Sequence, residues 1–306
     1  MTKLLLAGAT TCLVVAGPVA AAGGNPFICK DLEAKQQMLP REPTPRDLNF
    51  MLFDAVKSGC TELMAVLIAA GASVEARDRF GNTPLLLAAA AGQDEAIKLL
   101  LDFGARIDHR NLAGSSPLLR AAMDNRWRTG ILLLERGADP NLANGQKLSA
   151  LHAAAYDGNE KLVQALLAHG AIPDATDATG KSPAIYAAAR AYVEIVDRLI
   201  AAGVDPNRRY GHGLTLLMWA AGHSNDTPRQ DGVTTVRRLL DLGAEPNAID
   251  DRGWSALMIA AERSHAEVAA LLLERGADPT IAGKDGRRAA DLTSDEALRA
   301  TLLPAR

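Results

Sequence analysis

Residues 83–105 read TPLLLAAAAGQDEAIKLLLDFGA, and this stretch decides the fold. Thr83 is a favourable helix N-cap, because its hydroxyl accepts a hydrogen bond from a free backbone N–H. Pro84 then stands at the first helical position, where no hydrogen bond is lost. An apolar run with an alanine pair follows, and a second apolar stripe ends at Gly104, where glycine takes the left-handed turn that terminates a helix. The stretch therefore predicts two short helices joined by a turn.

The same pattern recurs along the chain. Glycine followed by Ala or Val returns in steps of 33 residues, with a single step of 40, at Gly71, Gly104, Gly137, Gly170, Gly203, Gly243 and Gly276. The helix start keeps the same steps at Thr83, Ser116, Ser149, Ser182, Thr215 and Ser255. Two markers that share one period and one interruption predict a solenoid, in which each unit buries its apolar stripes only against its neighbours.

Residues 149–154, SALHAA, come close to a Thr-Pro-Leu-His-x-Ala motif, and at this point the chain resembles the ankyrin repeat. The resemblance implies an all-α ankyrin-repeat solenoid of helix-turn-helix units with short β-hairpin turns. It covers residues 47–306 as about seven repeats, of which 47–79 lacks the Thr-Pro start, and 286–306 forms a truncated cap. Lys147 replaces the usual turn glycine, so we expect that hairpin to differ in shape. His152 is expected to tie its turn together.

The N-terminal residues predict export. Lys3 precedes an apolar run of small residues to Ala22, and residues 20–22 fit an A-x-A cleavage site, so we expect 1–22 to be a signal peptide. A membrane anchor is the alternative, although the strongly apolar part is short for a span. No other stretch is long and apolar enough to cross a bilayer. Residues 23–46 contain four prolines and are expected to be a linker or N-terminal cap, with a short helix over 31–39.

Two cysteines, Cys29 and Cys60, remain after signal cleavage. An exported chain meets an oxidising compartment, where two thiols pair readily. We predict a Cys29–Cys60 disulfide that pins the N-terminal segment to the first repeat. The alternative is a buried Cys60 and a free Cys29.

Composition and motifs argue against catalysis and nucleic-acid binding. The formal net charge is -3, and the sequence lacks an RNP motif, zinc-finger spacing or a basic run. Motifs for zinc hydrolases, serine hydrolases and phosphate loops are absent, and the acidic residues follow the repeat period. His212 and His223 with Asp226 form only a weak candidate metal site. We therefore expect no enzyme activity, no cofactor and no metal.

The single step of 40 adds seven residues to the sixth unit, within 223–233. Added loop length costs little entropy, so a tolerated surface loop is one interpretation. A binding loop is the other.

In the family, partners usually contact the concave side, formed by hairpin tips and the exposed face of each first helix. Trp219 and Tyr186 fall at core positions, and Trp127 falls in an inter-helix turn. Tyr, Trp and Arg dominate the energetics of many interfaces. The predicted partner-binding positions are Arg79, Phe80, Asn82, Leu112, Met123, Asp124, Tyr156, Asp157, Arg190, His223, Asp251, Arg252, Trp254, Glu262 and Arg263.

The resemblance implies a monomeric protein–protein interaction module. Exported bacterial relatives of this kind are regarded as scaffolds or modulators of periplasmic enzymes. An immunity-type inhibitor of a single enzyme and a secreted effector that acts in a host cell are the alternatives. The sequence does not identify the partner.

Overall fold

A computed structural model describes residues 25–40, 42–223 and 229–303. The predicted signal peptide lies outside these residues. Within them all regular elements are helical, and strand pairing is limited to one isolated bridge between Ala282 and Arg288. The helices are α1 (Pro26–Gln37), α2 (Pro45–Ser58), α3 (Thr61–Ala69), α4 (Pro84–Ala91), α5 (Asp94–Asp102), α6 (Pro117–Met123), α7 (Trp127–Glu135), α8 (Ala150–Tyr156), α9 (Glu160–Ala168), α10 (Pro183–Ala189), α11 (Val193–Ala201), η1 (Gly211–Gly213), α12 (Leu216–Ala221), α13 (Arg229–Asp241), α14 (Ala256–Glu262), α15 (Ala266–Glu274), α16 (Ala289–Leu292) and α17 (Glu296–Leu302).

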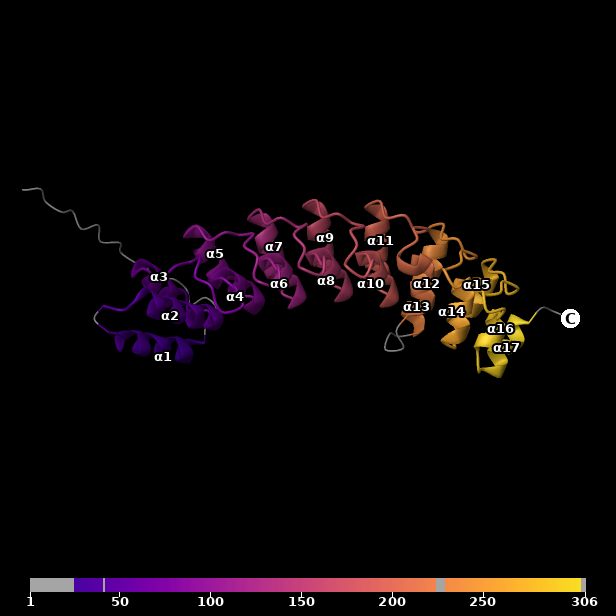
Figure 1. Cartoon of the computed structure of the whole chain (residues 1–306), viewed down its shortest axis with the longest axis horizontal. Coiled ribbons are helices and arrows are strands. Elements are labelled where there is room, and N and C mark those ends of the chain that lie inside the picture. Colours follow the sequence, from indigo (N-terminus) through magenta and orange to yellow (C-terminus); the bar gives the residue numbers. More distant parts are fainter. Residues whose placement is uncertain (1–24, 41, 224–228, 304–306) are drawn as a thin grey trace, which may run out of the picture.

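The helices stack in pairs into an arched rod (Figure 1). The first helices of the pairs, such as α6, α8 and α10, follow the inner side of the arch, and their partners α7, α9 and α11 follow the outer side. Seven pairs run from α2–α3 to α14–α15, and the short pair α16–α17 closes the C-terminal end. The predicted all-α solenoid is confirmed.

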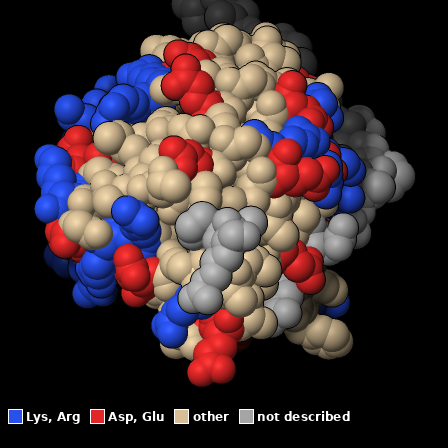
Figure 2. All heavy atoms as spheres, turned by 90° about the vertical axis from the view of Figure 1, so that its right-hand side faces the viewer, with Lys and Arg blue, Asp and Glu red and all other residues tan. Residues whose placement is uncertain are grey.

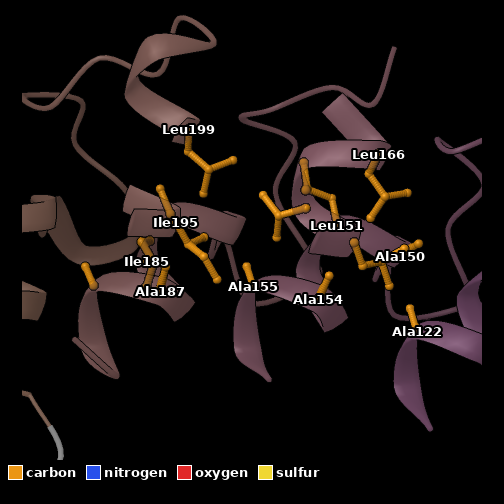
Figure 3. Packing of buried hydrophobic residues seen from close by; sticks show 14 of the residues in the cluster. Ala122, Ala150, Leu151, Ala154, Ala155, Leu166, Ile185, Ala187, Ile195 and Leu199 are labelled. Atoms are coloured by element: carbon orange, nitrogen blue, oxygen red, sulfur yellow. The ribbon is translucent and has the colours of Figure 1, made fainter. Parts of the chain in front are cut away.

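Alanine lets neighbouring first helices approach closely, and larger residues fill the space between them and the second helices. Ala154 and Ala155 of α8 are completely buried, as are Leu151 and Leu166 of the same repeat. Figure 3 shows these side chains beside those of the next repeat. Each buried leucine contributes about 2 kcal/mol by leaving water. The core is therefore one continuous strip along the rod.

The hairpins are joined tip to tip by backbone hydrogen bonds. The N–H of Leu112 donates to the carbonyl of Phe80 at 3.0 Å, and the N–H of Gly145 donates to that of Ala113 at 3.1 Å. Carboxylates stabilise the hairpins themselves: Asp78 Oδ1 accepts the N–H groups of Phe80 and Asn82 at 2.8 and 2.9 Å. Successive repeats are thus held by polar contacts at the tips as well as by the core.

The hairpin that contains Lys147 keeps the common shape, contrary to the expectation. Lys147 adopts φ +58°, the left-handed conformation of Gly81 at the matching place. Its N–H donates to the carbonyl of Asn144 at 2.9 Å, as the N–H of Gly81 does to Asp78 at 3.0 Å. The contacts on both sides of the turn impose a backbone conformation that is unfavourable for lysine.

The first repeat starts earlier than the period suggested, and it does have a Thr-Pro start. Thr44 caps α2, its hydroxyl accepting from the N–H of Asp47 at 3.3 Å, and Pro45 follows at the first position. The period missed this start because α2 has 14 residues, whereas α6, α8 and α10 have 7 each.

Helix α1 packs beside α2 at the N-terminal end of the rod (Figure 1) and is longer than the short helix expected over 31–39. Leu32 is its buried residue. A disulfide joins Cys29 of α1 to Cys60, the N-cap of α3, across a sequence separation of 31 residues. Residues 26–37 therefore form a covalently attached cap.

The seven-residue insertion partly becomes helix. Second helices normally start eleven residues after the N-cap, as Trp127 does after Ser116, so seven more residues would move the start in the sixth repeat to Val233. Helix α13 instead starts at Arg229 and has 13 residues, against 9 in α7, α9 and α11. Part of the insertion is therefore an extra helical turn, and residues 224–228 lie outside the described residues.

Candidate interaction surface

The repeat register places large side chains on the inner side of the arch. Tyr186 stands four residues after its N-cap Ser182, and Tyr156 stands seven after Ser149. Residues three or four apart share one face of a helix, so both rings emerge on the same side of α8 and α10. Trp219 occupies the place of Tyr186 in α12, and Met123 that of Tyr156 in α6.

We call these four residues, with Lys181 and Arg190, the central patch. The rings of Tyr156 and Tyr186 meet edge to face, with centroids 5.8 Å apart. The ammonium group of Lys181 lies 5.8 Å from the Tyr186 centroid and 5.4 Å from the Trp219 centroid, so it bridges two repeats. Met123 is 44% exposed and Tyr156 49%, which makes them accessible to a partner. The patch crosses four repeats.

A hollow of about 300 Å³ lies within the patch. Tyr156, Tyr186 and Met123 form its apolar walls, and it is also lined by Leu148, His152, Ala153 and Asp157. One apolar side chain of a partner fits a hollow of this size and composition.

Hydrogen bonds fix the Tyr186 ring. Its hydroxyl donates to Asp177 Oδ2 at 2.5 Å, and Asp177 Oδ1 accepts the N–H groups of Thr179 and Lys181 in the hairpin. Burial, followed by the contact with the Asp177 carboxylate, raises the pKa of Tyr186 to about 12. The phenol is therefore neutral at physiological pH, and its ring is held in place before any partner arrives.

Two further residues complete the site: Arg190 lies over the Tyr156 ring, and buried His152 lines the hollow. The Arg190 guanidinium lies 4.6 Å from the Tyr156 centroid, a cation–π arrangement. His152 is buried beneath the hollow, and its Nδ1 accepts the N–H of Ser149 at 3.2 Å. Burial lowers the pKa of His152. A neutral, hydrogen-bonded His152 is consistent with the expected structural role.

The structure divides the predicted contact residues into groups. Met123, Tyr156, Asp157 and Arg190 come together at the central patch. Arg79, Phe80 and Leu112 are exposed on adjacent hairpin tips near the N-terminal end. Four more predicted residues are exposed on the seventh repeat, away from both groups: Asp251, Arg252, Glu262 and Arg263.

Two of the remaining predicted residues have structural contacts. The side chain of Asn82 donates to Asp78 Oδ2 at 2.9 Å and accepts from the side chain of Asn111 at 2.8 Å. Asp124 pairs with Arg120 at 2.7 Å. We infer that these residues support the surface, whereas Met123 and Tyr156 present it.

The expectation that Trp254 and His223 lie on the surface is wrong. Trp254 is 5% exposed, because the residue before the N-cap faces the next hairpin. Its indole lies under the guanidinium of Arg252 at 4.1 Å and packs so closely on Gly283 that a Cβ there would lie 2.9 Å away. His223 is 4% exposed, because its ring stacks on that of His265 with centroids 4.2 Å apart.

The inner face instead includes Tyr186 and Trp219, which the periodicity assigned to the core. Both are half-buried. Trp127 is the first residue of α7 and is not in a turn. The sequence did contain a signal that this position is not part of the core. Four residues after the N-cap, the successive repeats have Leu87, Arg120, Ala153, Tyr186, Trp219 and Ile259. Such chemical variety is unusual for a core position.

Within the described part of the chain, His, Cys, Asp and Glu side chains form no group of three or more suited to a metal ion. Among the same residues, no helix has the length and apolar character required to span a bilayer.

Comparison with known proteins agrees with the stacked pairs. The sequence matches the family described as ankyrin repeats in three copies, over residues 52–144, 129–210 and 194–282. The chain belongs to the ankyrin-repeat family. Ankyrin repeats generally mediate protein–protein interaction and are typically non-enzymatic.

The curated relatives match only locally. A mitochondrial disaggregase of Bos taurus is 43% identical over 56 residues, which are 18% of this chain and 8% of that protein. An ankyrin repeat-containing protein of Schizosaccharomyces pombe is 39% identical over 57 residues, which are 18% of this chain and 28% of that protein. The chain thus matches less than a third of the length of each relative.

Proposed function

We propose that this ankyrin-repeat chain is an exported interaction module or scaffold of the bacterial periplasm. It binds a protein partner through the central patch and catalyses no reaction itself. The observation that carries the proposal is the row of large side chains on α6, α8, α10 and α12. The framework uses small alanines on these helices, whereas Tyr156, Tyr186 and Trp219 lie half-buried or exposed on the inner side. Anchors that are held by the fold lose little conformational freedom on binding.

Export is supported by two independent features. Residues 1–22 have the pattern of a signal peptide. The Cys29–Cys60 disulfide fits an oxidising compartment, because such bonds are rare where thiols are kept reduced. Cell fractionation that recovers the mature chain from the cytosol alone would contradict this part of the proposal.

Site-directed photocrosslinking tests the binding face. A photoreactive residue replaces Tyr156 of α8, and a matched one replaces Gln164, which is exposed on α9 of the same repeat. We expect a discrete crosslinked protein, identified by mass spectrometry, from the position of Tyr156 alone. Equal crosslinking from both positions would count against a specific concave site.

Affinity measurements with the captured partner then test the anchors. Tyr156→Ala combined with Trp219→Ala is expected to weaken binding by more than about 2 kcal/mol, or about thirtyfold, because large aromatic anchors dominate interfaces. Glu135→Ala combined with Gln164→Ala, both on exposed second-helix positions, is the control and should bind as the parent does. Unchanged affinity of a folded aromatic double variant would refute the proposal.

The identity of the partner separates the scaffold from its alternatives. A single enzyme that is captured and loses its activity would indicate an immunity-type inhibitor. A host protein as the only partner would indicate a secreted effector.

A further inference from the structure

A second hollow lies at the N-terminal end of the rod and has a different chemistry. It has a volume of about 760 Å³ and lies between α2 and the first hairpin. Arg46, Asn49, Phe50, Phe53 and Lys57 line it from α2. Residues 76–80, ARDRF, line it from the hairpin segment.

The hollow exists because α2 is long. Arg46, Phe50, Phe53 and Lys57 are spaced by four, three and four residues, so they lie on one face of the helix. A first helix of seven residues, as in α8, is too short to carry a stripe of this length. The additional turns of α2 therefore add a surface that the central repeats lack.

Four cations surround the hollow: Arg46, Lys57, Arg77 and Arg79. None of them forms an ion pair with a described residue, whereas Arg106, Arg136, Arg208, Arg238 and Arg275 each pair with an acid of the preceding repeat. Four cations and one acid thus line this hollow, on a chain whose formal net charge is -3.

The one acid that lines the hollow, Asp78, interacts electrostatically with Lys57 and offsets only one of the four positive charges. Asp78 Oδ1 accepts the N–H groups of Phe80 and Asn82, and Oδ2 accepts the side-chain amide of Asn82. Asp47 is similarly engaged with Thr44 at the start of α2, at 2.6 Å between the hydroxyl and Oδ2. Two carboxylates, of which Asp47 interacts electrostatically with Arg46, thus stand against four cations, so the charge around the hollow stays positive.

Apolar rings form the rest of the hollow. Phe50 is 58% exposed and Phe80 55%, and Phe53 is buried beneath them. The guanidinium groups of Arg46 and Arg79 lie over the rings of Phe50 and Phe80, at 5.5 and 4.7 Å from their centroids. Three of the five phenylalanines of the chain are in this one place, and guanidinium groups lie over two of them.

From these observations we propose that the N-terminal hollow binds an acidic peptide segment of a protein partner. An apolar side chain of the segment lies between Phe50 and Phe80, and its Asp and Glu carboxylates meet Arg46, Lys57, Arg77 and Arg79. Arginine forks match carboxylates in a bidentate manner. This inference deepens the proposed interaction function, but it does not depend on the central patch.

Charge distribution favours a peptide over a nucleic acid. A duplex needs a long basic stripe, and the cations here are confined to one hollow. At the other end of the rod, basic side chains are interspersed with acidic ones (Figure 2). This arrangement fits a short segment whose negative charges lie close together, opposite the four cations of the hollow.

Fluorescence anisotropy with the full chain tests the proposal. The probe is a short fluorescein-labelled peptide in which Glu and Asp surround a Phe and a Leu. We expect saturable binding that weakens as salt is raised. Replacing the acids of the peptide by Gln and Asn, or its Phe and Leu by Ala, should each weaken binding at least tenfold. Equal binding of either altered peptide, or no binding of the original, would overturn the proposal.

Charge reversal locates the site. Arg46→Glu combined with Arg79→Glu, both at exposed positions, should weaken peptide binding at least tenfold while circular dichroism remains that of the parent. Arg198→Glu combined with Arg237→Glu, two exposed cations of α11 and α13, is the matched control and should leave binding unchanged. An equal loss with this control would show a non-specific charge effect and refute the site.

Two further measurements show whether the central patch or a nucleic-acid site accounts for the peptide binding. Tyr156→Ala combined with Trp219→Ala should leave peptide binding unchanged, so the central patch and this hollow are tested independently. A single-stranded oligonucleotide that displaces the peptide at lower concentration would identify a nucleic-acid site and overturn the inference, without bearing on the central patch.

Discussion

The N-terminal hollow and the central patch are both built on first helices of the repeats, yet they arise in different ways. The hollow depends on the length of α2, which has 14 residues and a stripe of arginine, lysine and phenylalanine. The central patch depends on which side chains occupy first helices of 6 or 7 residues. Their volumes are about 760 and 300 Å³.

The difference teaches how a repeat framework diversifies. Residues that face the neighbouring repeat are constrained by close packing, and they look alike along the chain. Helix length at an end and the variable inner positions are constrained much less. The longer end helix produces a hollow with four cations and three phenylalanines, and the variable inner positions produce a surface of two tyrosines, a tryptophan and a methionine. The two sites should therefore respond differently to the same perturbation.

Removal of the disulfide is the strongest way to separate the two sites. Cys60→Ser is expected to destabilise α1–α3 by about 3 kcal/mol, because the bond closes a loop of about 31 residues in the unfolded chain. Nearest-neighbour coupling in repeat proteins should confine the effect to the N-terminal end. Hydrogen exchange measured by mass spectrometry should become about a hundredfold faster in α1–α3 and stay unchanged in α8–α11.

Cys29→Ser and the double serine variant provide the controls, since all three variants lack the same bond. Similar acceleration in the three would assign the effect to the disulfide. Acceleration that extends equally to α8–α11 would contradict the independence of the two sites.

A substitution at Lys147 compares the hairpin beside the central patch with the hairpin of the N-terminal hollow. Lys147 near the central patch has φ +58°, where the N-terminal hairpin has Gly81 at φ +75°. Lys147→Gly should raise the free energy of unfolding by about 1 kcal/mol, since glycine tolerates the left-handed region. Urea denaturation followed by circular dichroism measures the change.

Gly180→Lys is the reverse substitution at the matching place of the next hairpin. The nearest atoms to its Cβ would be those of Gly211 at 3.8 Å, so space does not complicate the result. It should lower the free energy of unfolding by a similar amount. A destabilised Lys147→Gly variant would mean that the lysine side chain makes a stabilising contact.

The smallest expected effect is a pH dependence of stability that arises from His152, which lines the hollow of the central patch. Burial lowers the pKa of His152 from its usual 6.5, while Asp177 acts in the opposite direction. The unfolded state then binds more protons than the folded state, so the stabilisation present above about pH 6.5 is lost as the pH falls through the window below it.

Urea unfolding at a series of pH values between about 7 and 5 tests this. His152→Gln should flatten part of the pH dependence, and His223, whose pKa is also lowered by burial, should account for a separate part. An unchanged slope in the folded His152→Gln variant would rule out His152 as a source.

Much of the fold could be predicted from the sequence because its determinants are local and repeated. Ser149 caps α8 wherever its neighbours lie, and the spacing of apolar residues follows from helix geometry alone. The start of the first repeat at Thr44 was missed because an end unit is free to lengthen its helix. The shape of the Lys147 hairpin was missed because residue type was read without the contacts that impose the turn.

The interaction surface was less predictable, because exposure in a solenoid depends on the neighbouring repeat. Trp254 was expected outside but is covered by Gly283 and Arg252 of the hairpins. Trp219 was expected inside, but it is half-buried beside Lys181 of the preceding repeat. Trp254 stands directly before its N-cap and Trp219 four residues after its own, and only the packing of the neighbouring repeat shows which of these two positions is covered.

By itself, the sequence determined that this chain is a stack of paired helices, since each cap, alanine pair and terminal glycine acts within a few residues. The tertiary structure alone decided which side chains face a partner and that four unpaired cations gather around three phenylalanines. The physical reason is that burial and electrostatic pairing are set by residues about one repeat or more apart in the chain, which meet only when the repeats stack.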